Sequence, residues 1–196
     1  MSTNARPALF LDRDGVLNEE VYYLHDPRDL VLIEGVGRVI ADFNRLRIPV
    51  VVVTNQAGIG RGYYDVAAYE SVNRAMSEGL RTDQAAIDAW YFCPHAPDSG
   101  CLCRKPQPGM ILQAIADLGL DASKSILVGD KISDLEAATA AHVTGVLVRT
   151  GYGLEEEQVL RKTQPLLSTP VYDSLSRAHS ALRSCFGFPT VDEKNL

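Results

Sequence analysis

The sequence predicts an α/β protein with a Rossmann-like, doubly wound parallel sheet that carries helices on both faces. Short β-rich runs alternate along the chain with longer segments whose apolar residues recur at helical spacing. One of these runs, residues 50–53, consists of consecutive valines, as expected for a strand buried on both faces. Repeated strand–helix–strand alternation places neighbouring strands parallel, because each crossover helix returns the chain to the same end of the sheet.

The expected strands are short apolar runs that stop at polar or glycine residues. The first run ends at Asp12 and the fourth at Gly129. Such runs, rich in Val, Ile, Leu and Phe, are typical of buried strands. In chain order the expected strands are residues 8–11, 50–53, 87–92, 125–128 and 145–148, with a further short strand near Val171.

The segments between the strands have the spacing and the end signals of helices. Asp65 suits an N-cap, and Pro108 suits a first helical position, where its missing N–H costs nothing. Gly119 is typical of a helix end. The expected helices are residues 36–46, 65–80, 108–118, 133–141 and 174–182, and the acidic run 155–157 is expected to begin a further, solvated helix.

Length and composition indicate one globular domain. The 196 residues, 46% of them hydrophobic and 22% charged, predict a single domain over residues 1–187 and a tail over 188–196. A net charge of -6 argues against nucleic-acid binding, and no apolar run reaches the roughly 20 residues that span a bilayer. We expect a cytoplasmic monomer with no membrane contact. Only about twenty residues separate the first strand from the first helix, so no large cap domain is expected there.

Polar residues that could carry chemistry directly follow four of the expected strands. Asp12-Arg13-Asp14-Gly15 follows the first, Thr54-Asn55-Gln56 the second, Cys93-Pro94-His95 the third and Gly129-Asp130-Lys131 the fourth. In a doubly wound sheet, ligands bind beyond the carboxyl ends of the strands. We therefore expect these residues to meet at one edge of the sheet.

Three aspartates at this edge predict a magnesium site. Asp12 and Asp14 would point the same way in an extended segment, and two close carboxylates repel unless a cation holds them or one pKa rises. Asp130 would complete an oxygen-rich site for Mg²⁺. Such a site suits phosphoryl transfer, with Asp12 as the nucleophile that forms an acyl-phosphate. Asp14 would protonate the leaving alcohol and then deprotonate water.

Thr54 and Lys105 suit the same chemistry. The Thr54 hydroxyl can donate to a phosphate oxygen, and Lys105 can supply a fixed positive charge. Each motif alone has a simpler explanation: a turn or half of a calcium loop at residues 12–15, turns at 54–56 and 129–130, and a solvated Lys105. Their common position at strand ends favours the phosphoryl-transfer site.

Three cysteines and a histidine predict a second metal site. Cys93, His95, Cys101 and Cys103 lie within the zinc loop, as we call residues 93–103. Three thiolates and one imidazole match a closed tetrahedral Zn²⁺ site, which leaves no position for a reacting water and is therefore structural. The loop leads directly into Lys105, so zinc would hold this lysine toward the phosphate. Unligated loop cysteines are the simpler alternative.

Four segments together resemble the motifs of the haloacid dehalogenase (HAD) superfamily. Residues 10–18 are similar to its first motif, 53–56 to its second, Lys105 to its third and 128–134 to its fourth. The resemblance spans residues 8 to about 150. It implies a Rossmann-like core, Mg²⁺, Asp12 as nucleophile, Asp14 as acid/base and Asp130 as a metal ligand, and it leaves open whether Asp134 contacts the metal.

The zinc loop narrows the resemblance to two groups of zinc-loop phosphatases in this superfamily. One acts on a heptose bisphosphate, for lipopolysaccharide biosynthesis, and the other acts on histidinol phosphate. Residues 53–62, 106–110 and 148–151 are more similar to the first group, whereas the short loop is nearer the second. The resemblance implies a small phosphorylated metabolite as substrate. The implied contacts are Glu20, Val21, Tyr22, Tyr23, Thr54, Asn55, Gln56, Ala57, Arg104, Lys105 and Lys131, and Arg104 and Lys131 could meet a second phosphate.

Three functions stay open at this point. The favoured one is a sugar-bisphosphate phosphatase that works through an aspartyl-phosphate. The second keeps this chemistry on histidinol phosphate or another small monoester. The third is a zinc-stabilised binding module whose site is inactive, which the complete set of polar residues disfavours.

Overall fold

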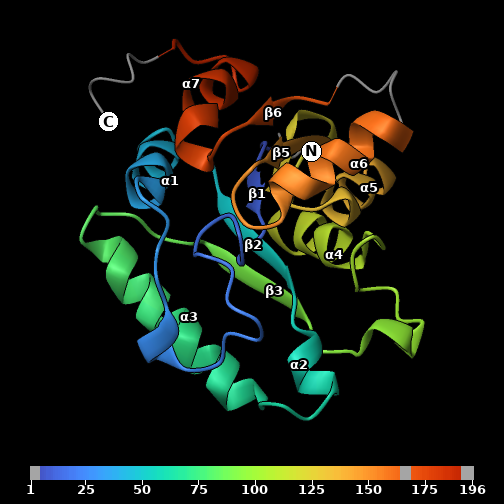
Figure 1. Cartoon of the computed structure of the whole chain (residues 1–196). Coiled ribbons are helices and arrows are strands. Elements are labelled where there is room, and N and C mark those ends of the chain that lie inside the picture. The colour runs from blue at the N-terminus through green and yellow to red at the C-terminus, as the bar shows by residue number, and fades with distance from the viewer. Residues whose placement is uncertain (1–4, 164–168, 191–196) are drawn as a thin grey trace.

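A computed structural model describes residues 5–163 and 169–190, and these form a parallel sheet between two layers of helices (Figure 1). The strands are β1 (Leu9–Leu11), β2 (Val50–Asn55), β3 (Ala89–Cys93), β4 (Ile126–Gly129), β5 (Thr144–Val148) and β6 (Val171–Tyr172). Their order across the sheet is β3-β2-β1-β4-β5-β6, and every pair is parallel. The predicted fold class is confirmed.

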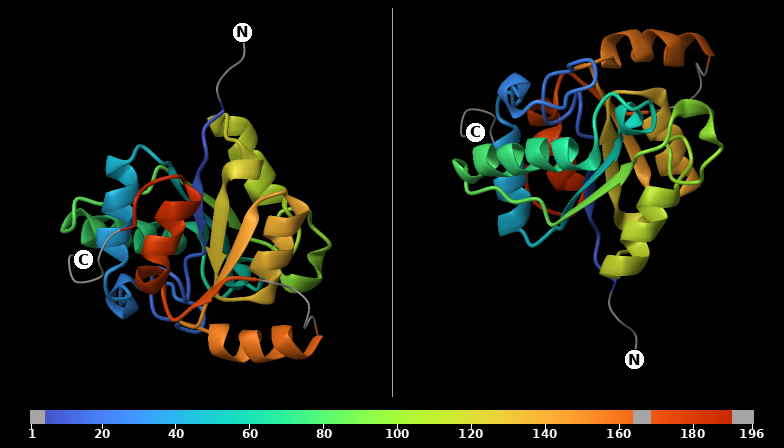
Figure 2. Two further views of the ribbon diagram at one scale, coloured as in Figure 1. Left: turned by 90° about the horizontal axis from the view of Figure 1, so that it is seen from above. Right: turned by 90° about the horizontal axis from the view of Figure 1, so that it is seen from below.

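The helices cover both faces of the sheet, as Figure 2 shows from two sides. Helices α1, α3 and α7 lie on one face of the sheet, and α4 and α5 lie on the other. Helix α6 packs against strand β5. Their bounds are α1 (Val36–Arg45), α2 (Ala57–Gly60), α3 (Val66–Arg81), α4 (Gly109–Leu118), α5 (Ile132–Ala140), α6 (Gly153–Thr163) and α7 (Leu175–Cys185). Short 3₁₀ turns occupy Pro27–Asp29, Pro97–Ser99 and Ala122–Lys124.

Alternate residues of each central strand enter different hydrophobic cores. Leu9 and Leu11 pack among residues of α1, α3 and α7, whereas Phe10 between them packs against α4 and α5. Side chains alternate across a strand, so a strand with helices on both sides must be apolar at every position. This explains the unbroken valine run of β2, whose residues 50–53 divide between the same two cores.

The connection between β1 and α1 contains one 3₁₀ turn and no cap domain, as expected. The described part of the predicted tail, residues 188–190, contacts the rest of the domain. Phe188 packs on the core that contains residues of α1, α3 and α7, and the carbonyl of Pro189 accepts a hydrogen bond from Arg183. The rest of that tail, residues 191–196, lies outside the described residues. Within the described residues, none of the helices combines the length and apolarity that crossing a membrane requires.

Candidate active site

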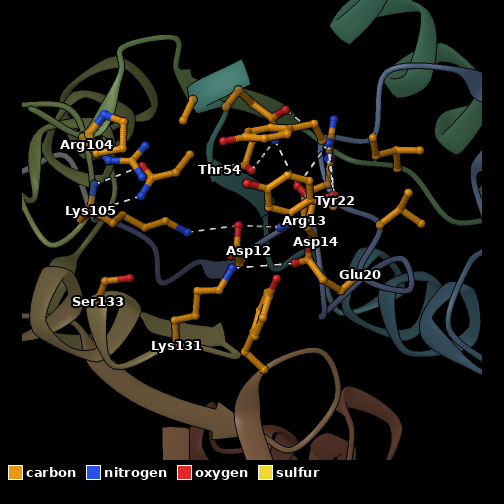
Figure 3. Close-up of a pocket in the computed structure, with 18 of the residues that line it drawn as sticks. Asp12, Arg13, Asp14, Glu20, Tyr22, Thr54, Arg104, Lys105, Lys131 and Ser133 are labelled. Atoms are coloured by element: carbon orange, nitrogen blue, oxygen red, sulfur yellow. Dashed lines mark hydrogen bonds and ion pairs between the residues drawn. The ribbon is translucent and has the colours of Figure 1, made fainter. Parts of the chain in front are cut away.

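The carboxyl ends of the strands open into one cavity of about 430 Å³ (Figure 3). Asp12 follows β1, Thr54 lies at the end of β2, and Lys131 follows β4. All parallel strands end at the same edge, which is why residues distant in the chain meet here. The cavity is lined by every residue that the resemblance implied as a substrate contact: Glu20, Val21, Tyr22, Tyr23, Thr54, Asn55, Gln56, Ala57, Arg104, Lys105 and Lys131.

Lys105 binds two carboxylates at the floor of this cavity. Its Nζ lies 3.0 Å from Asp12 Oδ1 and 2.6 Å from Asp134 Oδ1, and it also donates to the carbonyl of Val53 at 2.8 Å. Burial opposes the charged ammonium, but Asp12 and Asp134 outweigh burial and raise the pKa of Lys105 above its ordinary value. Lys105 therefore stays a cation although only 3% of its surface is exposed.

Asn55 fixes the backbone of Lys105. Its side-chain amide donates to the Lys105 carbonyl at 3.1 Å, and its side-chain oxygen accepts the Lys105 N–H at 3.1 Å. This reciprocal pair ties the end of β2 to the segment that follows the zinc loop. The position of the ammonium is thus set from both sides, by the strand and by the loop.

Asp130 is fully buried between two glycines. A Cβ on Gly15 or on Gly151 would lie 2.3 Å from Asp130 Oδ2, so neither position has room for a side chain. Oδ2 accepts the N–H of Tyr152 at 2.9 Å, whereas Oδ1 has no hydrogen-bond partner among the described residues. Burial, followed by the charge of Asp12, raises the pKa of Asp130 to about 8.

Asp12, Asp130 and Asp134 form what we call the acidic group: one carboxylate oxygen of each lies within 4.8 Å of the others. Burial, with Lys105 in opposition and Asp134 and Asp14 adding to it, raises the pKa of Asp12 to about 6. A buried set of carboxylates with an unpartnered oxygen is what a hard divalent cation binds. The donor set therefore fits Mg²⁺, with Asp12 and Asp130 as the residues that would hold it.

Asp14, which the sequence placed beside Asp12 in the magnesium site, does not join the acidic group. Strand β1 ends at Leu11 and the chain bends at Arg13, so the rule that residues i and i+2 point together no longer applies. The Asp14 carboxylate accepts from Arg13, from Asn18 Nδ2 at 3.1 Å and from Gln56 Nε2 at 3.0 Å. A role of Asp14 as a metal ligand stays a prediction.

Asp134, whose part was left open, is the third member of the acidic group. Its Oδ2 accepts the backbone N–H of Lys131 at 3.0 Å and so caps α5. Its Oδ1 faces Lys105. The Asp134 carboxylate thus caps α5 and also holds the cavity lysine.

Glu20 and Lys131 face each other across the outer part of the cavity. Lys131 Nζ lies 3.7 Å from Glu20 Oε2 and 4.3 Å from the centre of the Tyr152 ring. Burial, opposed by Lys131, raises the pKa of Glu20 to about 7. Arg104 adds a second cation, and its Nη1 is buried without a hydrogen-bond partner among the described residues. An unpartnered guanidinium nitrogen in a cavity is suited to an anionic ligand.

The cavity also contains residues to which the sequence interpretation assigned no role in chemistry or binding. Arg13 stands between the two motif aspartates, and this position was a signal that could have been used. Tyr152 comes after strand β5 and directly follows Gly151, the glycine that packs against Asp130. Arg61 and Tyr64 come after helix α2. Residues 57–60 form helix α2, and Gly58 packs on the Tyr64 ring.

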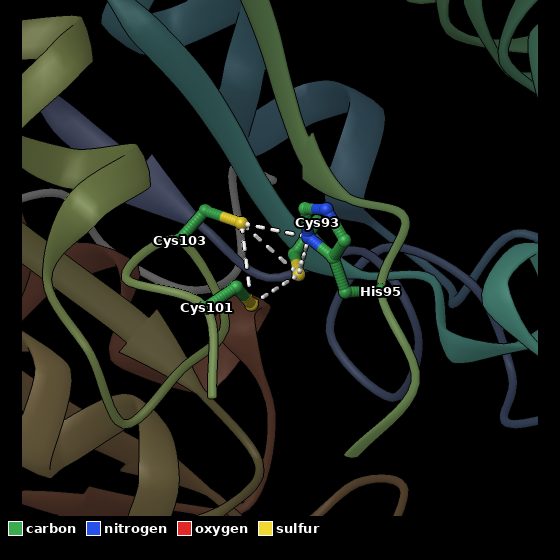
Figure 4. A group of neighbouring side chains, drawn as sticks. All are labelled: Cys93, His95, Cys101 and Cys103. Atoms are coloured by element: carbon green, nitrogen blue, oxygen red, sulfur yellow. Dashed lines mark hydrogen bonds between the residues drawn. The ribbon is translucent and has the colours of Figure 1, made fainter. Parts of the chain in front are cut away.

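The zinc loop brings its four predicted ligands together (Figure 4). The contacts between Cys93, His95, Cys101 and Cys103 measure between 3.2 and 3.6 Å from sulfur to sulfur or to His95 Nδ1. Tetrahedral ligands at bonds of about 2.3 Å would lie about 3.8 Å apart, and a disulfide would be about 2 Å. The cysteines are free thiols, and the four donors therefore fit Zn²⁺.

Comparison with known proteins agrees with this geometry. A family model described as HAD-hydrolase-like matches residues 102–178. D-glycero-β-D-manno-heptose-1,7-bisphosphate 7-phosphatase of Vibrio cholerae is 41% identical over 179 residues, which cover 87% of this chain and 93% of that protein. The enzyme of the same name from Escherichia coli K12 is 41% identical over 159 residues, covering 77% and 83%.

Solved structures show the same likeness in three dimensions. The crystal structure of D,D-heptose 1,7-bisphosphate phosphatase from B. bronchiseptica, complexed with magnesium and phosphate, superposes with a TM-score of 0.84. Its identity is 32%, and the match covers 91% of this chain and 98% of that one. With the acidic group, the zinc loop and relatives at about 40% identity over most of their length, the chain belongs to the HAD-like phosphatase family.

Proposed function

We propose that this protein is a Mg²⁺-dependent phosphatase that removes the C7 phosphate from D-glycero-D-manno-heptose 1,7-bisphosphate through an aspartyl-phosphate on Asp12. The observation that carries the proposal is the meeting of Asp12, Lys105 and Asp130 at one buried point below a cavity rich in cations. The names of the relatives support the choice of substrate.

The first half of the reaction forms the covalent intermediate. An Asp12 carboxylate oxygen bonds to phosphorus while the bond from phosphorus to the C7 oxygen breaks. Asp14 gives a proton to that leaving oxygen, so the sugar departs as a neutral alcohol. In the second half, Asp14 takes a proton from water, the water oxygen bonds to phosphorus, and the bond to Asp12 breaks with release of inorganic phosphate.

The surrounding residues bind and neutralise the transferred phosphate. Bound Mg²⁺ supplies a positive charge that lets the anion approach a carboxylate. Lys105 adds a second fixed charge beside Asp12, and the buried Thr54 hydroxyl lies at the same edge of the sheet. These groups are in place before the substrate arrives, which lowers the cost of organising charge in the transition state.

The outer cations suit the second phosphate of a bisphosphate. Arg104 and Lys131 line the cavity that holds the reacting centre, and Arg61 lies with them. A cavity of about 430 Å³ lies in the range of small-molecule sites. A bisphosphate would therefore be held at one end by Lys105 and at the other by Arg104 and Lys131. The expected monomeric state and cytoplasmic location stay predictions.

The test is a measurement of phosphate release with three substrates: heptose 1,7-bisphosphate, heptose 1-phosphate and histidinol phosphate. We expect the highest kcat/KM for the bisphosphate. The Arg104→Ala variant should lose this preference, since it removes a cation placed for the second phosphate. A higher kcat/KM for histidinol phosphate would favour the alternative enzyme, and no release from any phosphorylated metabolite of a panel would favour an inactive binding module.

A further inference from the structure

Arg13 is an almost completely buried arginine beside the reacting centre to which the mechanism above assigns no role. Only 1% of its surface is exposed. Arginine is almost never buried this deeply unless its charge is paired and its N–H groups are satisfied, because taking an unpaired charge out of water costs several kcal/mol. The partners of Arg13 therefore indicate what it is for.

The first partner is Asp14. Arg13 Nε donates to Asp14 Oδ1 at 3.2 Å, and Nη2 lies 3.0 Å from Oδ1 and 3.1 Å from Oδ2. Both carboxylate oxygens are thus held by one planar fork, a geometry that a lysine cannot reproduce. The Asp14 side chain keeps 17% of its surface exposed, on the cavity that both residues line.

The remaining face of Arg13 is held by helix α3. Nη1 donates to Asn73 Oδ1 at 3.4 Å, and the guanidinium carbon lies 5.5 Å from the centre of the Tyr69 ring. Asn73 and Tyr69 are one helical turn apart on the buried side of α3. Helix α3 contributes no residue to the cavity itself, so Arg13 is its connection to Asp14.

Gln56 closes the network on the other side. Its Nε2 donates to Asp14 Oδ2 at 3.0 Å and to Thr54 Oγ1 at 2.9 Å, while its Oε1 accepts from Arg13 at 3.2 Å and from the Tyr64 hydroxyl at 2.7 Å. The Asp14 carboxylate thus accepts from donors on three side chains, Arg13, Asn18 and Gln56. This arrangement is complementary to an ionised carboxylate in one fixed orientation.

We propose that Arg13, held by Asn73 and Tyr69 of α3, is the positioning residue for Asp14 and stabilises the carboxylate left when Asp14 protonates the leaving oxygen; this rests on the proposed phosphatase function. As the phosphorus–oxygen bond breaks, the proton moves from Asp14 to that oxygen. The negative charge that stays on Asp14 then meets the guanidinium fork already in place. The benefit is confined to the first half of the reaction, in which Asp14 gives up its proton.

The proposal makes a prediction about leaving groups. An alkyl phosphate needs a proton on its leaving oxygen, whereas p-nitrophenyl phosphate releases a stable anion without one. The second half, in which Asp14 acts as a base, is common to both substrates, so the comparison uses the rate of the first half, measured as release of the leaving group in a single turnover. In the Arg13→Lys variant we expect this rate to fall about 100-fold for heptose 1,7-bisphosphate, in line with the value of general acid catalysis. For p-nitrophenyl phosphate we expect it to change less than about fivefold, with KM for both substrates nearly unchanged.

Two further variants complete the test. Asn73→Ala removes a hydrogen-bond partner of Arg13 and should show the same selective loss, at about tenfold. If circular dichroism shows that Arg13→Lys is unfolded, Asn73→Ala is used for the test in its place. Arg74→Lys, an exposed arginine on the same helix, is the matched control and should leave both rates unchanged. Equal losses on both substrates, or no loss on either, would overturn the role of Arg13.

The outcome for the proposed function is read separately, from the unaltered protein. If that protein releases phosphate from neither substrate, the phosphatase proposal fails. If it hydrolyses both and only the selective loss in the variants is missing, the phosphatase function stands and the assignment of Arg13 fails.

Discussion

The two candidate metal sites lie close together in the fold but differ in donor chemistry and in completeness. The zinc loop offers three sulfur atoms and one nitrogen, and its four donors already surround one point. The acidic group offers oxygen atoms from two distant segments, and it contains an unpartnered Asp130 oxygen and two carboxylates with raised pKa values. A closed set of soft donors suits a structural ion, while an incomplete set of hard donors suits an ion that shares a substrate.

Lys105 connects the two sites. It follows Cys103 by two residues, and its ammonium contacts both Asp12 and Asp134. Burial raises the pKa of the Cys93 thiol to about 12, so a metal is needed to ionise it at neutral pH. The comparison therefore predicts a division of labour: changes at Asp12 and Asp130 should affect chemistry alone, and changes in the zinc loop should affect both stability and chemistry.

The largest expected effect is that of Asp12→Asn. The amide is a poor nucleophile, so kcat should fall by about 10⁴-fold or more. Zinc content and the unfolding temperature should stay at the values of the unaltered protein, as measured by metal analysis and calorimetry. Residual turnover near the original rate would show that Asp12 does not bond to phosphorus.

Asp130→Asn comes next. It removes a carboxylate that would hold Mg²⁺, and we expect the Mg²⁺ concentration for half-maximal activity to rise at least about tenfold. The control is Asp98→Asn, an exposed aspartate of the zinc loop, which should leave this concentration unchanged. An unchanged magnesium requirement in Asp130→Asn would remove Asp130 from the cation site.

Loss of zinc should have a smaller effect on kcat, but it should also lower the stability of the protein. We expect Cys101→Ser to lower the unfolding temperature and also to reduce kcat by about tenfold, since Lys105 loses the loop that positions it. Cys185→Ser changes the exposed cysteine at the end of α7 and serves as the control. After EDTA treatment, added Mg²⁺ alone should restore activity only while zinc is retained. Full activity in a zinc-free protein would show that the zinc loop does not position Lys105 for catalysis.

The smallest effect concerns an ionic cluster outside both sites. Glu157, expected to be solvated, is buried and accepts from Arg149 and Arg161, and these hydrogen bonds lower its pKa to about 2. A folded pKa below the unfolded one means that the stabilisation is present above about pH 4.5 and is lost as the pH falls toward about 2.

Glu157→Gln should therefore lower the unfolding temperature by about 2 °C at pH 7, and the difference should shrink as the pH falls below about 4.5. Thermal unfolding followed across pH checks this. The exposed Glu155→Gln variant of the same helix is the comparison. A difference that does not depend on pH would mean that packing, and not the charge of Glu157, provides the stabilisation.

The sequence predicted those features that depend on local pattern or on strand topology. Strand and helix positions follow from apolar spacing, and the meeting of Asp12 with Asp130 follows from the rule that parallel strands end at one edge. The zinc loop was predictable because its four ligands are close in the chain. These are cases in which short-range signals decide the structure.

The remaining features depend on contacts between side chains that no spacing rule describes. The Asp14 carboxylate stays outside the acidic group because Arg13 binds it, and Asn73 supports Arg13 from a helix sixty residues away. Glu157 is buried because Arg149 and Arg161 approach it. The direction of a charged side chain is decided by such partners, and these become visible only in three dimensions.

The central position of β1 has a consequence for the newly made chain. One edge of β1 pairs with β2, which is close in the chain, but its other edge pairs with β4, and the N–H of Ala8 donates to a side chain 117 residues further on. Until then, β1 carries an open row of backbone hydrogen-bonding groups, the kind of edge that recruits foreign strands. Completion of the catalytic centre and closure of this edge depend on the same segment, so an unfinished chain is both inactive and prone to aggregate.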